Sequence, residues 1–164
     1  MGKNTYPLLI IRTENVHTFA AMKRMKIFFT CALMLFLVTC KKDSSQSEVQ
    51  YVLVDYYVYL SQPQYGLLNT VGNWAYIPSG VRGIVVYHQS PDVFIALERN
   101  CTFQPSTSSA VVSVDSSNVF LADTSCGSKF YLTDGSVAHG PATVPLKQYH
   151  TSYNSTSMTL HIYN

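Results

Sequence analysis

Two cysteines, Cys101 and Cys126, are the side chains best suited to chemistry, because thiolates bind metals and carry out redox reactions. Asp123 lies close to Cys126 in the sequence, and His139 or His150 could complete a set of four donors for zinc or a similar ion. The tight ligand spacings typical of zinc motifs are absent, however. The histidines are more simply interpreted as surface or hydrogen-bonded side chains: His88, His139, His150 and His161. We therefore assign no metal ligand from these residues alone.

No motif of a known catalytic class accompanies the cysteines. The sequence has no Gly-x-Ser-x-Gly turn, no Walker loop, no His-Glu-x-x-His helix and no paired acids. A Ser-His-Asp triad can be assembled from distant positions, but nothing in the sequence indicates which residues would form one. We therefore predict no catalytic residues and no enzymatic activity.

The charge of the chain argues against nucleic-acid binding. The 164 residues carry a formal net charge of +2, but five of the eleven basic residues precede Cys40. Beyond Cys40, six basic residues are scattered among eight acidic ones. A protein that neutralises phosphates needs a basic stripe or patch, and this pattern provides none.

Three of the five early basic residues, Lys23, Arg24 and Lys26, belong to a predicted targeting segment. Residues 22–26 form a charged head, and residues 27–38 form an apolar stretch that ends just before Cys40. Twelve residues span about 18 Å as a helix, less than the roughly 20 residues that cross a bilayer. The pattern is typical of a signal peptide. Residues 1–21 are unusual ahead of one, so we expect translation to start at Met22 or Met25.

The end of this segment, Leu-Val-Thr-Cys, resembles the lipobox of bacterial lipoproteins, with Thr39 where a smaller residue is usual. The resemblance implies cleavage before Cys40 and lipidation of Cys40. Acyl chains on that residue would anchor the protein to a membrane without spanning it. Residues 40–50 would form the lipidated cysteine and a polar, flexible spacer. We expect a location in the bacterial cell envelope, periplasmic or surface-facing.

The rest of the chain, residues 51–164, has the pattern of an all-β domain. β-Branched and aromatic runs alternate with turn-forming residues, and one stretch, residues 63–69, has room for a single helical turn. In residues 52–60 the even-numbered side chains are expected on one face of a strand and the odd-numbered ones on the other. The predicted strands are residues 52–60, 74–77, 83–87, 93–97, 110–114, 119–122, 129–132 and 158–163. The Ser/Thr-rich pieces 105–117 and 151–157 are interpreted as loops. This pattern predicts a single-domain antiparallel β sandwich or small barrel.

Residues 126–146, CGSKFYLTDGSVAHGPATVPL, resemble the second half of the Rieske [2Fe-2S] domain, in which Gly-Ser-x-Phe follows a ligand motif and Gly-Pro-Ala comes later. Residues 94–103 are similar to the strand that leads into the first ligand loop of that family. The resemblance covers residues 52–164 and implies a Rieske-like antiparallel β fold. The matching positions are Gly127, Ser128, Phe130, Gly135, Gly140, Pro141, Ala142, Pro145 and Leu146.

The ligand positions depart from that family. A Rieske centre takes Cys-x-His from one loop and Cys-x-x-His from the other. Here Cys101 keeps the first position, Phe103 replaces the first histidine, Asp123 replaces the second cysteine and Cys126 replaces the second histidine. A phenyl ring has no lone pair to donate, so we expect no cluster and no cofactor-binding or metal-ligand residues. The alternative cofactors are a 2Fe-2S cluster or zinc held by altered ligands.

The family's two ligand loops meet at the tip of the domain, so the resemblance implies that Cys101 and Cys126 approach each other. Exported chains meet oxidising conditions, in which such cysteines usually pair. A disulfide between Cys101 and Cys126 is the expectation, with two free thiols or a different metal as alternatives. The additional disulfide that some Rieske domains carry between the two loops has no counterpart, because Ser106 and Ser125 occupy the positions assigned to it.

These observations predict a lipid-anchored Rieske-fold protein without a functional cluster, acting as a binding or structural module. Its expected partners are the membrane, through the lipid, and an unidentified protein or glycan of the cell envelope. The eleven tyrosines beyond Cys40, together with Trp74, could line a partner-binding face, although such residues more often pack a sheet. The alternative function is electron transfer through a 2Fe-2S cluster or another metal held by altered ligands.

Overall fold

The computed structural model describes residues 48–164. The predicted signal peptide, the lipidation of Cys40 and most of the spacer lie outside the described residues. Within residues 48–164, no helix has the length and apolar character needed to cross a membrane.

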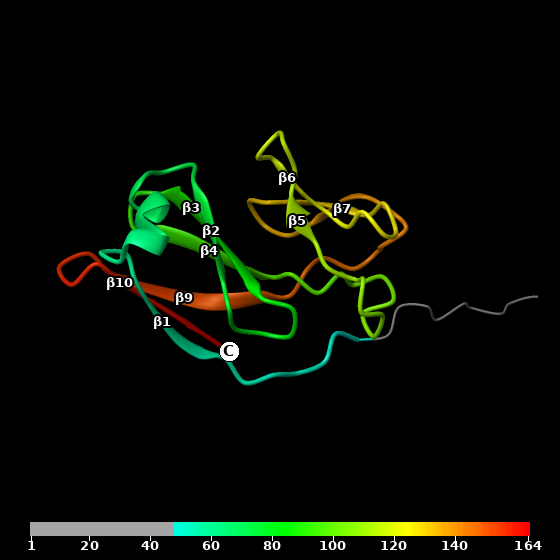
Figure 1. The fold of residues 1–164 in the computed structure, drawn as a ribbon, viewed down its shortest axis with the longest axis horizontal. Coiled ribbons are helices and arrows are strands. Elements are labelled where there is room, and N and C mark those ends of the chain that lie inside the picture. Colours follow the sequence, from blue (N-terminus) through cyan, green and yellow to red (C-terminus); the bar gives the residue numbers. More distant parts are fainter. Residues whose placement is uncertain (1–47) are drawn as a thin grey trace, which may run out of the picture. The chain divides into compact units, whose positions relative to one another are not determined.

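Ten antiparallel strands and one short helix form the described part of the chain (Figure 1). The predicted all-β antiparallel fold is confirmed. The strands, in chain order, are β1 (Asp55–Tyr59), β2 (Trp74–Ile77), β3 (Ile84–Ser90), β4 (Val93–Glu98), β5 (Ser113–Val114), β6 (Phe120–Ala122), β7 (Lys129–Tyr131), β8 (Val137–His139), β9 (Gln148–Asn154) and β10 (Thr159–Tyr163). The 3-10 helix η1 (Pro63–Asn69) occupies the stretch for which one helical turn was expected.

The strands form two sheets. The larger sheet has six strands in the order β1-β10-β9-β4-β3-β2, and the smaller has four in the order β5-β6-β7-β8. Figure 1 shows β5, β6 and β7 set apart from the larger sheet. The chain therefore leaves the large sheet after β4, builds the small sheet and returns through β9, so the loops after β4 and before β9 both adjoin the small sheet.

Strand β1 lies at the edge of the larger sheet, and its side chains alternate between buried and exposed. The predicted alternation is confirmed, since Val54, Val58 and Leu60 are buried whereas Leu53 and Tyr57 are exposed. The strand pairs with β10 along its whole length, from Asp55 opposite Tyr163 to Tyr59 opposite Thr159. The exposed odd-numbered side chains leave one face of this strand to solvent.

The prediction of a loop at residues 151–157 is wrong for residues 151–154, which belong to β9. This strand, QYHTSYN, is rich in polar residues because only one of its faces packs: Tyr149 is buried, whereas His150 is exposed. Its position comes from pairing with β10 on one side and β4 on the other. Strand β8 was not predicted either, because its three residues are too few to form a pattern.

Two hydrophobic cores share the hairpin of β3 and β4. Ile84 and Val86 pack in the first core, against η1 and strands β1, β9 and β10, whereas Val85 and Leu97 pack in the second, against the small sheet and its loops. Because neighbouring side chains of a strand point to opposite faces, a hairpin buried on both faces needs a continuous apolar run. The sequences IVV in β3 and FIAL in β4 supply it.

Candidate thiol and carboxylate site

Three loops meet beside the second core and position the sequence-predicted residues. The first loop follows β4, the second joins β6 to β7, and the third joins β8 to β9. The first and third are tied by the Thr102 hydroxyl, which donates to the Val144 carbonyl at 2.6 Å. The second and third are tied by the Ala142 N–H, which donates to Ser128 Oγ at 3.0 Å. The side chains of Cys101 and Cys126 are therefore held in place by side-chain contacts between loops distant in sequence.

Cys101 and Cys126 lie together as the Rieske resemblance implied, with their sulfur atoms 3.8 Å apart. Both are free thiols in this structure, because a disulfide needs a sulfur separation of about 2.05 Å. The disulfide thus stays a prediction. Cys101 is fully buried, whereas Cys126 is partly exposed and lies 3.1 Å from the Ser128 hydroxyl.

Asp123 adds a buried carboxylate to the two thiols. Its side chain is only 1% exposed, and Oδ1 accepts hydrogen bonds from the Ser125 N–H at 2.8 Å and the Ser125 hydroxyl at 2.6 Å. Oδ2 has no hydrogen-bond partner of ordinary geometry within residues 48–164. A carboxylate oxygen of Asp123 and the two sulfurs all lie within 4.8 Å of one another. The site therefore contains three potential metal donors close together.

Burial and hydrogen bonding set the protonation of these groups. Burial alone would raise the pKa of Asp123, but the hydrogen bonds from Ser125, with smaller contributions from the two thiols, more than offset it and lower the pKa. The pKa of Cys101 is strongly raised, chiefly by burial and further by Asp123 and Cys126. The resting site is therefore a carboxylate beside a protonated, buried Cys101 thiol.

In the reduced, folded protein, iodoacetamide is expected to alkylate Cys126 before Cys101, by about tenfold or more, because only a thiolate attacks and access to Cys101 is blocked. Peptide mass mapping over a time course measures both rates. Labelling of Cys101 should still be slow at pH 9, because its raised pKa keeps most of the thiol protonated. Denaturant should make the two rates similar, and equal rates in the folded protein would contradict the geometry.

Phe103, His139 and His150 do not add a fourth donor to Cys101, Asp123 and Cys126. Phe103, at the position of the family's first histidine, packs partly buried against the second core. His139 and His150 are exposed, and the only group of three or more potential donors within residues 48–164 is Cys101, Asp123 and Cys126. A two-iron cluster needs four ligands, so the donors present in the described chain do not fit one.

The outcome for the histidines is mixed. His139 and His150 are exposed, and His161 bonds Asp55 at 2.7 Å through Nε2, as expected of surface or hydrogen-bonded residues. The prediction is wrong for His88, which is buried with no hydrogen bond to either ring nitrogen among the described residues. Its ring instead stacks on Phe94, with centroids 4.2 Å apart.

No protein-family model matches this chain, and no curated protein matches it. Among solved structures, the chain is similar to one in the complex of reduced oxygenase and oxidized ferredoxin in carbazole 1,9a-dioxygenase. The TM-score is 0.42 and the sequence identity 16%, over 70% of this chain and 94% of that chain. A likeness this weak does not indicate a function, so we infer one from the side chains of the site itself.

Proposed function

We propose that residues 51–164 are a Rieske-like domain that holds no iron-sulfur cluster and acts as a binding or structural module. In this proposal the protein is exported, anchored through lipid on Cys40 in a bacterial cell envelope, and has no enzymatic activity. Support for the fold assignment comes from residues 126–146 and from the approach of the Cys101 and Cys126 loops, which the resemblance implied.

The observation that carries the proposal is the set of side chains at the meeting of these loops. Phe103 and Asp123 stand where the family has a histidine and a cysteine, and Phe103 packs against apolar neighbours. Cys101 and Cys126 remain, with their sulfurs 3.8 Å apart. Oxidation would join them by losing two protons and two electrons to a cellular disulfide or another thiol oxidant. The bond would then tie the two loops together.

A second candidate rests on a different property of the same group. Two thiolates bound at about 2.3 Å to one tetrahedral ion lie about 3.8 Å apart, and the sulfurs of Cys101 and Cys126 have this separation. The buried Asp123 Oδ2, without an ordinary hydrogen bond in the described chain, would be a third ligand. The alternative is thus a single thiophilic ion such as zinc, with the protonated thiols losing their protons on binding.

Metal analysis and a visible absorption spectrum of freshly purified, full-length protein test these functions. The expected result is a colourless protein with well below one equivalent of iron or zinc. Brown protein with a low-temperature EPR signal would contradict the proposal and support the electron-transfer alternative. Colourless protein with one equivalent of zinc, lost in both Cys126→Ser and Asp123→Asn, would contradict it in favour of the single-ion site.

A further inference from the structure

The loop that joins β2 to β3 is shaped by a buried carboxylate. Glu98, the last residue of β4, is 0% exposed, and its two oxygens accept hydrogen bonds from the backbone N–H groups of Val81 at 2.8 Å and Arg82 at 2.9 Å. They also accept from the Asn100 N–H at 2.9 Å and the Tyr149 hydroxyl at 2.8 Å. The buried Glu98 carboxylate therefore holds the backbone of this loop in one conformation.

Gly80 makes this close approach possible. Its φ of +84° is a backbone conformation that residues with a Cβ rarely adopt, and a Cβ there would collide with Glu98 Oε2. Beside the loop lies a cavity of about 460 Å³ that is widely open to solvent and lined by residues 76–83 and Arg99. This volume is within the range of roughly 300–1,000 Å³ that is usual for small-molecule sites.

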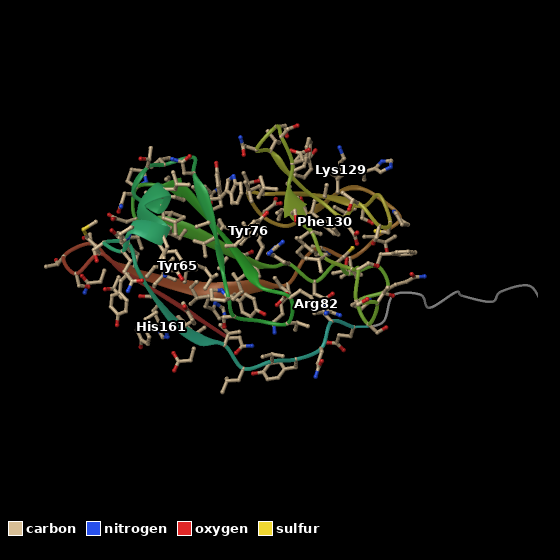
Figure 2. All side chains as sticks on the ribbon, in the orientation of Figure 1. Tyr65, Tyr76, Arg82, Lys129, Phe130 and His161 are labelled. Carbon is tan, nitrogen blue, oxygen red and sulfur yellow. The ribbon has the colours of Figure 1, made fainter. Side chains whose placement is uncertain are left out.

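Two guanidinium groups line this cavity. Arg99 is held rigidly, because its Nε donates to the Val112 carbonyl at 3.0 Å and its Nη2 to the Ser113 hydroxyl at 3.1 Å. Its guanidinium also lies 3.8 Å from the centre of the Tyr76 ring. Arg82 comes from the loop itself, and Figure 2 shows it on that loop, below Tyr76 of β2.

Neither arginine has a carboxylate partner within residues 48–164. The ion pairs in this part of the chain join Lys129 to Asp115 and His161 to Asp55, and Glu98 is engaged by its four donors. Arg82 Nε is buried without a hydrogen bond there, and its Nη2 makes only a long contact of 3.4 Å to the Thr107 carbonyl. The Arg82 guanidinium therefore has little to lose among the described residues when it binds an oxyanion.

We propose that this cavity binds a small organic anion, with its carboxylate or phosphate group held by Arg82 and Arg99. Guanidinium groups bind both oxyanions through paired hydrogen bonds. The volume exceeds that of a bare anion, and the apolar side chains of Pro78 and Val81, which are exposed and half-buried, would contact the rest of the ligand. A sugar acid or sugar phosphate has this size and chemistry. The inference does not depend on whether Cys101 and Cys126 are bonded, free or metal-bound.

NMR titration of the full-length protein in a nonionic detergent tests the proposal at constant ionic strength, since salt screens surface charge. The probes are inorganic phosphate, glucose 1-phosphate and glucuronate, with glucose as the neutral control. The expected result is saturable shifts of the amide signals of residues 79–83 with glucuronate or glucose 1-phosphate and none with glucose. Whichever of those two binds more tightly identifies carboxylate or phosphate as the preferred group.

Arg82→Gln is expected to weaken this binding about tenfold or more, through loss of charge-assisted hydrogen bonds. The matched control is Lys129→Gln, which removes one positive charge from β7, outside the cavity (Figure 2). Because the Arg82 side chain makes one long hydrogen bond within residues 48–164, the variant should fold normally, and circular dichroism checks this. Absence of saturable shifts, equal weakening by both variants, or tightest binding of phosphate alone would each overturn the proposal.

Discussion

Protein isolated without reductant is expected to be about 2 Da lighter than the reduced chain and more stable by about 3.5 kcal/mol in free energy of unfolding. The reason is that Cys101 and Cys126 are held 3.8 Å apart in the folded protein, with 24 residues between them in the chain. A bond between them would restrict the unfolded chain far more than the folded one. Intact mass spectrometry measures the first quantity, and guanidinium unfolding with and without reductant measures the second.

The Cys126→Ser variant is the matched control for this prediction. It removes one sulfur at a partly exposed position, so it should fold and show the same unfolding midpoint with and without reductant. If the wild-type protein has no mass deficit, or if its stability does not change with reductant, the cysteines are not paired. Metal analysis of that sample then separates free thiols from the single-ion site.

Glu98→Ala is expected to lower the free energy of unfolding by about 3–5 kcal/mol. The substitution leaves four donors without their acceptor: the N–H groups of Val81, Arg82 and Asn100, and the Tyr149 hydroxyl. It also removes a fully buried side chain. The cost stays below the sum of four buried losses, because the hydrogen bonds from Val81 and Arg82 are only partly buried.

Tyr149→Phe provides the scale for this prediction. It deletes one of the four hydrogen bonds to Glu98 and keeps the aromatic ring, so a loss of about 1–2 kcal/mol is expected. Urea unfolding of both variants gives the comparison. A Glu98→Ala protein within about 1 kcal/mol of wild type would mean that the carboxylate does not organise the loop.

The sequence was sufficient to predict most strands, because eight of the ten coincide with β-branched or aromatic runs. β9 was the largest miss. Its alternation depends on Tyr149 and Tyr153 among five polar residues, and its place between β10 and β4 comes from pairing that a local pattern does not contain. β1 was easier, because every core-facing position in it is apolar or aromatic.

The two candidate sites differ in how much of each could be predicted from the sequence. Cys101 and Cys126 were identified because cysteines are few and the surrounding motif is specific, whereas their distance depends on three loops that only the fold brings together. The Arg82 and Arg99 cavity had no motif. The one hint of it in the sequence was Glu98, an acidic residue at the end of the otherwise apolar strand β4. Acids are rarely buried without partners, so such a position indicates a structured polar contact nearby.

The shared hairpin has a consequence for how the molecule loses its structure. Val85 supports the second core while its neighbours Ile84 and Val86 support the first. If either core unfolds, β3 and β4 lose the packing on one of their faces, and the other core then loses the support of these two strands. We expect the two sheets to melt together in one cooperative transition, so no half-folded state with a single intact sheet accumulates.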